Sequence, residues 1–309
     1  MEVTLVNLSN NLYKESRFRL NTSAQSFNIN RIESYDFDDI KESSFFKDNE
    51  SILSQPKGIG YWLWKPYIIL EAFNKLAEDD IVIYCDAGLE VIADLQPLIN
   101  ICAHKEPILL FGNANQLNYE WTKRDCFVLM NCDESEYWHA PHCDAAFSLW
   151  RKNELSISFL NEWLKYGSDE RIITDLPNTC GKENLPGFAD HRWDQSILSL
   201  LAQKRKINLY RMPTQFGNHY KEHCYRISKE FLCVNQSKQG RIDYYHFLPY
   251  YNSPYGQLLN HHRSKKVLET PHTNISHATR KQASSIYKKL FRRTIKKLFR
   301  VLGYKLVKS

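Results

Sequence analysis

Residues 80–88 read DIVIYCDAG and decide the fold that this sequence predicts. Residues 81–85 form an unbroken apolar run, which is typical of a central strand buried on both faces of a parallel sheet. Such a strand delivers Asp86 to its carboxyl end, where Ala87 and Gly88 leave room for a ligand close to the backbone. A carboxylate there can hold a divalent metal that bridges a diphosphate, accept hydrogen bonds from a ribose, or simply cap a turn.

The segment before this strand predicts a helix over residues 61–77. Pro66 suits its first turn, and the apolar residues after it fall on one face at helical spacing. Lys65 stands at the start of this helix, close to Gly58 and Gly60. A lysine in such a place can bind phosphate; a solvated surface lysine is the ordinary alternative.

Strand-like and helix-like segments alternate through the rest of the chain. Strands are expected at residues 3–8, 25–35, 106–112, 144–150 and 208–213, and helices at 95–102, 154–166 and 194–204. Residues 36–56 are expected to form a loop with a short helix, and residues 174–189 a loop. This alternation predicts an α/β sheet, in which ligands bind outside the carboxyl ends of the strands.

Residues 190–195 read DHRWDQ, at the start of the last predicted helix. They bring acidic, basic, amide and aromatic groups together within six positions. That density suits a sugar site, because sugar hydroxyls need polar partners and the ring needs an apolar face. The alternative is a polar helix cap with Trp193 buried beneath it.

Composition restricts the class of protein further. The 309 residues suffice for one large α/β domain, and 43% of them are hydrophobic. The amino-terminal segment lacks the pattern of a secretory leader, and no apolar stretch is long enough to span a bilayer, so a cytoplasmic protein is expected. The eight cysteines contain no C-x-x-C pair, which favours reduced, buried thiols over a zinc site.

Five segments in this order resemble a family of bacterial glycosyltransferases found with capsule and lipopolysaccharide synthesis: GIGYWLWKPYIIL, DIVIYCDAG, WTKRDCFVLM, TDLPNTCG and DHRWDQSILSLLA. The resemblance covers about residues 1–263. More distantly, the chain is similar to glycogenin-like and yeast outer-chain mannosyltransferase-like enzymes. The resemblance implies a GT-A fold, in which a Rossmann-like nucleotide-binding sheet merges with an acceptor-binding half, and a nucleotide-diphosphate sugar as donor.

In the more distant groups, a helix with a basic residue precedes a strand that ends in D-x-D. Lys65 matches that basic residue and Asp86 the first acid, but Gly88 replaces the second acid. His246 weakly resembles the histidine that serves as a third metal ligand. Asp86 with His246 would therefore hold Mn²⁺ or Mg²⁺, although Gly88 leaves metal dependence open and a histidine among aromatic residues is more often part of a core.

The same resemblance implies roles for residues elsewhere in the chain. Lys123, Arg124 and Asp125 are equally well explained as a phosphate or acceptor contact and as a surface ion cluster. The predicted donor-binding residues are Asn7, Ser9, Lys65, Asp86, Ala87, Gly88, Asp144, His191, Arg192, Gln195 and Arg263. The predicted catalytic residues are Asp194, Asp190 and Lys65.

In this prediction, Lys65 neutralises charge that develops on the leaving diphosphate, helped by Arg263 at the end of the resemblance. Asp194 or Asp190 binds sugar hydroxyls or accepts the acceptor proton as a general base. An inverting enzyme needs such a base. A retaining enzyme can let the leaving diphosphate take the proton, and the distant resemblance leans toward retention.

The charge of the chain is divided unevenly. The net charge is +6, yet the residues after Glu269 contain eleven Lys/Arg and no acid, so subtracting them leaves −5 for residues 1–269. We expect a GT-A domain at 1–263, a linker at 264–283 and an amphipathic helix at 284–309. Apolar residues recur there at helical spacing: Ile286, Leu290, Phe291, Ile295, Leu298, Phe299 and Leu302.

A basic amphipathic helix of this kind is typical of an anionic membrane surface. It could instead dock on the acidic body or bind nucleic acid, but the body contains no nucleic-acid module. We therefore expect a peripheral protein on the inner face of the cell membrane, with a glycan or lipid-linked acceptor and no nucleic-acid partner. A non-catalytic carbohydrate-binding or scaffold protein with the same fold is the alternative, and a phosphohydrolase using Asp86 is disfavoured because D-x-D-x-T/V is missing.

Overall fold

The computed structural model describes residues 1–217 and 252–262, and the side chains of residues 114 and 115 are left out. All described residues belong to one compact unit, Met1–Lys265. The predicted linker, the basic helix, His246 and Arg263 lie outside the described residues. No helix within the described ranges is long and apolar enough to cross a membrane.

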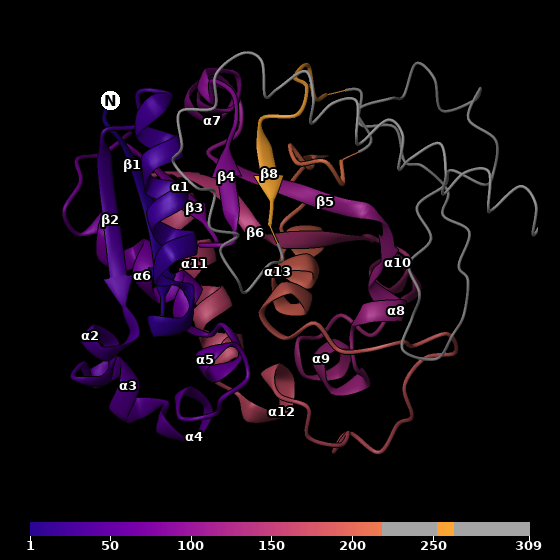
Figure 1. The fold of residues 1–309 in the computed structure, drawn as a ribbon. Helices are drawn as coiled ribbons and strands as arrows, with labels where there is room; N and C mark the ends of the chain where they lie inside the picture. Colours follow the sequence, from indigo (N-terminus) through magenta and orange to yellow (C-terminus); the bar gives the residue numbers. More distant parts are fainter. Residues whose placement is uncertain (218–251, 263–309) are drawn as a thin grey trace, which may run out of the picture. The chain divides into compact units, whose positions relative to one another are not determined.

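The core of the fold is a six-stranded sheet in the order β2-β1-β3-β6-β5-β7 (Figure 1). Its strands are β1 (Val3–Ser9), β2 (Arg31–Asp36), β3 (Ile81–Cys85), β5 (Ile108–Leu117), β6 (Pro141–Arg151) and β7 (Leu209–Arg211). Strand β1 lies parallel to both β2 and β3, which makes one half of the sheet Rossmann-like. Strand β6 runs antiparallel to β3 and β5, while β7 is parallel to β5.

Helices cover both faces of this sheet. The helices are η1 (Asn11–Tyr13), α1 (Lys14–Ser26), α2 (Phe37–Lys41), α3 (Ser44–Asp48), α4 (Glu50–Leu53), α5 (Gly58–Tyr61), α6 (Trp64–Phe73), α7 (Gln96–His104), α8 (Asn118–Trp121), α9 (Arg124–Leu129), α10 (Ser135–Trp138), α11 (Glu154–Gly167), α12 (Glu170–Ile173) and α13 (Trp193–Lys204). On one face, α6, α11 and α13 build the larger hydrophobic core. On the other face, α1 and α7 pack with the short ribbon of β4 (Leu89–Val91) and β8 (Leu259–His261).

The predicted α/β fold is confirmed, and its central strand is β3, whose five residues are all buried. The predicted helix at residues 61–77 is shorter, because α6 begins at Trp64 after a separate turn. Helix α1 was not predicted: residues 25–35 were expected to form a strand, yet the helix runs to Ser26 and the strand starts at Arg31. The reason is that α1 buries only Ser16, Leu20 and Ala24, which is too sparse a pattern to signal a helix.

Two other segments differ from expectation. Residues 36–56 contain three short helices rather than one, and Ser43 caps the middle one by accepting the Phe46 amide at 3.1 Å. The strand predicted at residues 208–213 is present as β7, but it is not the last strand, since β8 follows and pairs with β4. This pairing is long-range, so local sequence carries no sign of it.

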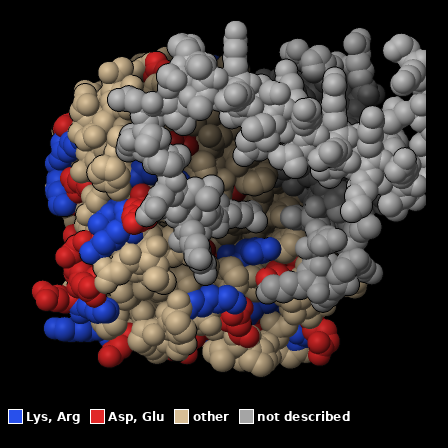
Figure 2. All heavy atoms as spheres, viewed as in Figure 1, with Lys and Arg blue, Asp and Glu red and all other residues tan. Residues whose placement is uncertain are grey.

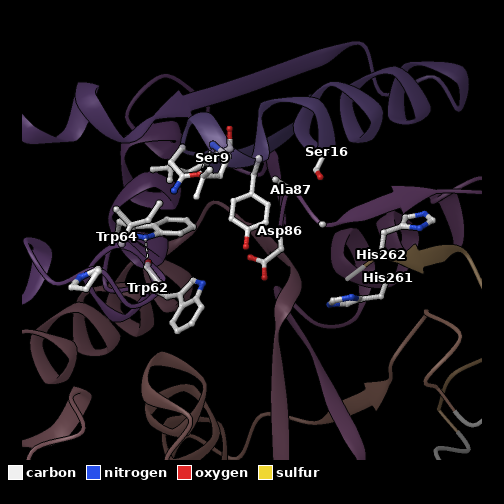
Figure 3. Close-up of a pocket in the computed structure, with 16 residues that line it drawn as sticks. Ser9, Ser16, Trp62, Trp64, Asp86, Ala87, His261 and His262 are labelled. Atoms are coloured by element: carbon white, nitrogen blue, oxygen red, sulfur yellow. Dashed lines mark hydrogen bonds between the residues drawn. The ribbon is translucent and has the colours of Figure 1, made fainter. Parts of the chain in front are cut away.

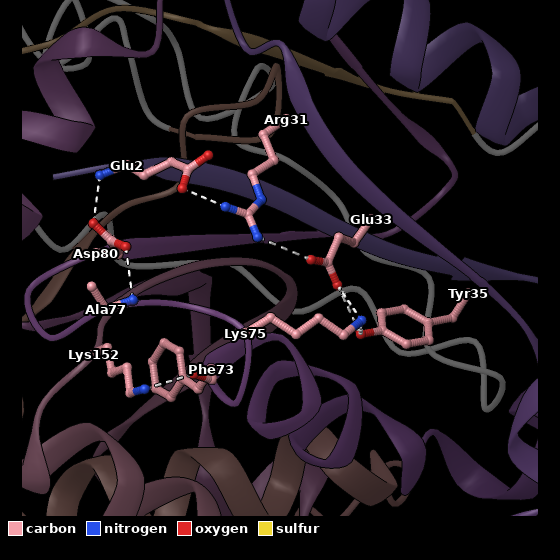
Figure 4. A network of polar contacts seen from close by, with 9 residues as sticks. All are labelled: Glu2, Arg31, Glu33, Tyr35, Phe73, Lys75, Ala77, Asp80 and Lys152. Atoms are coloured by element: carbon pink, nitrogen blue, oxygen red, sulfur yellow. Dashed lines mark hydrogen bonds and ion pairs between the residues drawn. The ribbon is translucent and has the colours of Figure 1, made fainter.

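Two sets of polar contacts stabilise the β2–β1–β3 half of the sheet (Figure 4). Asp80 accepts the Glu2 amide at 2.6 Å and the Ala77 amide at 3.0 Å, which joins the starts of β1 and β3. On the outer strand, Glu33 accepts from Lys75 at 2.8 Å and from the Tyr35 hydroxyl at 3.1 Å. The Asp80 contacts lie where β1 and β3 begin, whereas the Glu33 contacts lie farther along the outer strand, where Glu33 pairs with Val6 and Tyr35 with Leu8 of β1. Both sets of contacts support the fold.

Charge on the face seen in Figure 2 is mixed. Lysine and arginine alternate with acidic side chains on the side that carries β2 and α2–α4. Residues of these elements form ion pairs, among them Lys41–Asp38 at 2.7 Å and Lys75–Glu33 at 2.8 Å. A surface of this kind has no single-sign field for a polyanion.

Candidate active site

The chain order of the parallel strands creates a crevice. The chain leaves β1 for β2 on one side, and then returns to place β3 on the other side of β1. Such a switch point leaves room outside the carboxyl ends of the two strands. A cavity of about 550 Å³ lies there (Figure 3), lined in part by Ser9, Tyr13, Trp62, Asp86 and His261.

Asp86 stands at the end of β3 and lines the cavity with Ala87 and Gly88. Its Oδ1 atom accepts a hydrogen bond from the Tyr84 hydroxyl and lies 3.5 Å from Lys65 Nζ. The side chain is 28% exposed, so it faces the cavity while one oxygen is held from behind. This is the position that the strand-turn pattern predicted for it.

Lys65 is buried in the first turn of α6 rather than exposed at its end. Its ammonium lies 2.9 Å from Asp194 Oδ2 and donates to the Ala145 carbonyl at 3.0 Å. Burial disfavours the charged form, but Asp194 and Asp86 together outweigh it and raise the pKa of Lys65. Lys65 thus joins α6, β3, β6 and the start of α13 beneath the cavity.

Three carboxylates surround this single ammonium. Burial raises the pKa of Asp194 to about 7, although the nearby Lys65 opposes the shift. Burial also raises the pKa of Asp144, with Asp86 adding repulsion and His261 and Lys65 opposing it. Lys65 is therefore the shared counter-ion of all three acids.

Two predicted donor contacts at the end of β1 differ in position. Ser9 lines the cavity, and its buried hydroxyl has no hydrogen-bond partner among the described residues. Asn7 is fully buried beneath it and donates to Asn21 at 2.9 Å. Ser9 therefore lies at the cavity wall with a buried hydroxyl that has no partner among the described residues, whereas Asn7 faces helix α1.

The β4–β8 ribbon brings the carboxyl end of the described chain to the same cavity. The His262 amide donates to the Gly88 carbonyl at 2.7 Å, and its ring lies 2.6 Å from Glu90. A Cβ on Gly88 would come within 3.2 Å of the His262 carbonyl, so a small residue suits this close approach. His261 and His262 line the cavity opposite Trp62 in Figure 3.

From the DHRWDQ segment, Asp194 contacts Lys65 beneath the cavity. His191 is buried as a neutral ring that accepts from the Lys123 amide and donates to the Ile172 carbonyl at 2.8 Å. Arg192 lies over the Trp121 ring at 4.5 Å. These two residues, with Asp190 and Gln195, are not among the cavity lining, and their predicted roles stay predictions.

The GIGYW segment forms a turn in which every residue from Gly58 to Trp62 has a positive φ angle. Ile59, Tyr61 and Trp62 adopt this left-handed conformation although side chains disfavour it, by about 1 kcal/mol each. Trp62 then stacks on Trp193, whose φ is also positive, with ring centroids 5.2 Å apart. The turn places Ile59 and Trp62 in the cavity wall, and strain of this kind gathers at functional sites.

Lys123, Arg124 and Asp125 anchor a loop rather than face the cavity. The Asp125 carboxylate accepts the amides of Thr179 and Cys180 at about 2.8 Å. Lys123 donates to the Leu176 carbonyl at 2.8 Å. Lys123 and Asp125 are buried, so they are not the surface ion cluster that was one of the two predictions, and their contacts hold the loop at 174–189.

A divalent metal is the cofactor that the predicted fold implies. Within residues 1–217 and 252–262, no group of three His, Cys, Asp or Glu side chains is arranged to hold a metal ion. Asp86 stands alone at the strand end, with Gly88 in the second position and an ammonium 3.5 Å from its Oδ1. The described side chains therefore do not make a metal site, and the proposed partner His246 lies outside them.

No protein-family model and no curated protein matches this chain. Among solved structures, it is similar to mouse xyloside xylosyltransferase 1 at 9% identity and a TM-score of 0.45, covering 87% of this chain and 100% of that one. It is similar to the galactosyltransferase LgtC at 13% identity and a TM-score of 0.44, covering 84% and 87%. A third is the glycosyltransferase GlyE of Streptococcus pneumoniae TIGR4, at 14% identity and a TM-score of 0.37, covering 89% and 57%. The likeness concerns the α/β fold, and the function proposed below rests on the site.

Proposed function

We propose that this protein is a glycosyltransferase that moves a sugar from a nucleotide-diphosphate donor to a glycan acceptor. The observation that carries the proposal is the cavity at the β1–β3 switch point, with Asp86, Ala87 and Gly88 at its edge. A nucleotide suits such a crevice, because the strand ends supply polar groups and small residues admit the phosphates.

In this proposal, Asp86 and Ser9 hold the donor. The Asp86 oxygen that faces the cavity accepts hydrogen bonds from ribose or sugar hydroxyls, and the Ser9 hydroxyl gains the partner that it lacks among the described residues. Lys65 offsets part of the negative charge near the diphosphate, and Arg263 adds to it from beyond the described residues. Electrostatic stabilisation of the leaving group is the main catalytic contribution that such residues supply.

Asp194 then acts through Lys65, from which it is 2.9 Å away, since it lies behind the cavity wall. Its ionised form keeps the ammonium in place beside Asp86. Asp190 is the remaining candidate for a general base from this segment. Without one, the departing diphosphate takes the acceptor proton, as in a retaining transfer.

We further propose that the acceptor is lipid-linked and that the reaction serves surface polysaccharide synthesis, such as capsule or lipopolysaccharide. The support is the basic, apolar pattern of residues 284–309, which suits the anionic inner face of a cell membrane. On this proposal the enzyme is cytoplasmic and peripheral.

A non-catalytic carbohydrate-binding or scaffold protein is the second candidate. It is favoured by Gly88 in place of a second acid and by the absence of a metal-holding cluster among the described residues. Such a protein would bind a sugar or nucleotide in the cavity without turning it over.

The two candidates are separated by incubating the purified protein with UDP-, GDP-, CMP- and dTDP-sugars and detecting free nucleotide, with Mn²⁺, Mg²⁺ or EDTA present. The proposal expects release from one donor, lost in Asp86→Asn. Because hydrolysis without acceptor can be slow, donor-induced thermal stabilisation is measured in parallel. Stabilisation without release, even with glycan acceptors added, supports the scaffold. If neither stabilisation nor release is observed, both candidate functions are contradicted.

A further inference from the structure

We propose that Tyr84 is a positioning residue that holds one oxygen of Asp86 so that the other meets the donor. The inference rests on the proposed function, since it concerns how Asp86 contacts a nucleotide sugar. Strand β3 contains one aromatic residue, Tyr84, and its side chain is fully buried.

The strand geometry brings the two side chains together. Residues two apart on a strand point to the same side, so Tyr84 and Asp86 share one face at the end of β3. The Tyr84 ring packs near Trp64, with centroids 6.4 Å apart, and Trp64 lines the cavity. The phenol is thus fixed by the core, and its hydroxyl donates to Asp86 Oδ1.

The two oxygens of Asp86 consequently have different surroundings. Oδ1 accepts from Tyr84 and lies 3.5 Å from Lys65 Nζ. Oδ2 has no hydrogen bond from any residue that the structure describes, and the carboxylate lies in the cavity wall beside Ala87 (Figure 3). One oxygen is therefore held by the protein while the other is left to a ligand.

A phenol suits this task because it donates without adding charge. Burial, with a further effect of Asp86, raises the pKa of Tyr84 well above its ordinary value, so the hydroxyl stays protonated at neutral pH. A second lysine would compete with Lys65 for Asp194, and a carboxylate would add to three already present. A buried tyrosine orients Asp86 and leaves the charge of the cluster unchanged.

The test is a double-mutant cycle of Tyr84→Phe and Asp86→Asn, read as donor affinity by calorimetry with the nucleotide sugar that the wild type uses. Removing the hydroxyl should weaken donor binding about tenfold in the wild-type background, the order expected for a hydrogen bond to a charged group. In the Asp86→Asn background it should change affinity little, because the two groups act together.

Tyr35→Phe is the matched control, since Tyr35 also donates to a carboxylate, Glu33, but on the outer strand. It should leave donor affinity unchanged. Should Tyr84→Phe fail to fold, 3,5-difluorotyrosine can be placed at position 84 instead. It keeps the phenol ring and makes its hydroxyl a stronger hydrogen-bond donor. Its effect on nucleotide-sugar affinity should again vanish with Asp86→Asn.

Equal losses in both backgrounds would overturn the role of Tyr84 while leaving the proposed function intact. A wild type that binds no nucleotide sugar would overturn both. A tenfold loss that disappears with Asp86→Asn, at an unchanged unfolding midpoint, supports the proposal.

Discussion

At the residue scale, the site depends on how one ammonium is shared. Lys65 lies 2.9 Å from Asp194 and 3.5 Å from Asp86, and it is almost inaccessible to solvent. A buried charge keeps its place only when it is paired, because desolvation otherwise dominates. The two acids therefore differ in position: Asp86 faces the cavity, whereas Asp194 is buried beside Lys65 and favours its charged form.

This arrangement predicts a pH dependence. Because burial raises the pKa of Asp194 to about 7, its ionised fraction rises between pH 6 and 8. If the ionised form is required, kcat/KM should fall about tenfold for each pH unit below 7 and level off above it. Asp194→Asn should be less active, and its kcat/KM should no longer fall below pH 7. If the fall persists in the variant, a group other than Asp194 causes it.

At the element scale, the left-handed turn at residues 58–62 is the least ordinary part of the fold. Its two glycines are needed for different reasons. A Cβ on Gly58 would lie 2.3 Å from the Trp62 ring. The ring can move away, but this movement would change the cavity wall that it forms. A Cβ on Gly60 would lie 2.5 Å from the Leu53 Cα, which cannot move without shifting α4.

We therefore predict that Gly60→Ala lowers the free energy of unfolding by about 2 kcal/mol or more. Gly181→Ala, at a positive φ with open space around it, should lower it by about 1 kcal/mol. Gly256→Ala, with open space and no positive φ, serves as the neutral control. Urea denaturation measures all three. Similar midpoints for Gly60→Ala and Gly256→Ala would contradict the described turn.

At the scale of the whole molecule, two buried histidines link stability to pH. Burial lowers the pKa of His142 and of His191 to about 3, so both stay neutral in the folded protein. The unfolded chain binds protons at these residues below about pH 6.5, and their contribution to stability is lost as the pH falls from there toward 3. Asp194 acts in the opposite sense, since its raised pKa makes the folded state bind a proton first.

Between pH 7 and pH 5, each histidine should reduce the free energy of unfolding by about 2 kcal/mol. His142→Gln should remove the contribution of one histidine to this pH dependence. The free energy of unfolding of the variant should therefore depend less steeply on pH than that of the wild type. Chemical denaturation at several pH values measures the difference. Parallel profiles for the two proteins would mean that His142 takes up its proton over the same pH range in the folded and unfolded states, which would contradict its lowered pKa.

The membrane proposal also belongs to this scale. Replacing by serine the seven apolar residues that recur at helical spacing within 284–309, with every lysine and arginine kept, should release the protein from vesicles containing phosphatidylglycerol. Co-flotation measures binding, and neutral phosphatidylcholine vesicles are the control. Unchanged binding of the variant would show that charge alone suffices and would contradict insertion of an apolar face.

The elements that were predicted correctly are those whose buried residues form a clear apolar pattern within the element itself. The apolar run before Asp86 specified β3, and the periodic apolar residues of α11 and α13 specified those helices within a residue or two of their observed bounds. Helix α1 escaped prediction because it buries few side chains, and β8 because its partner β4 is far away in the sequence.

The sequence by itself therefore determined the α/β class, the strand that ends at Asp86 and the small residues after it. Only the tertiary structure decided that Lys65 is buried against Asp194, that Tyr84 holds Asp86, and that β8 brings His261 and His262 to the cavity. The physical reason is the range of the interactions. Hydrophobic periodicity acts over a few residues and is visible in sequence, whereas an ion pair between residues 65 and 194 exists only once the sheet has brought α6 and α13 together.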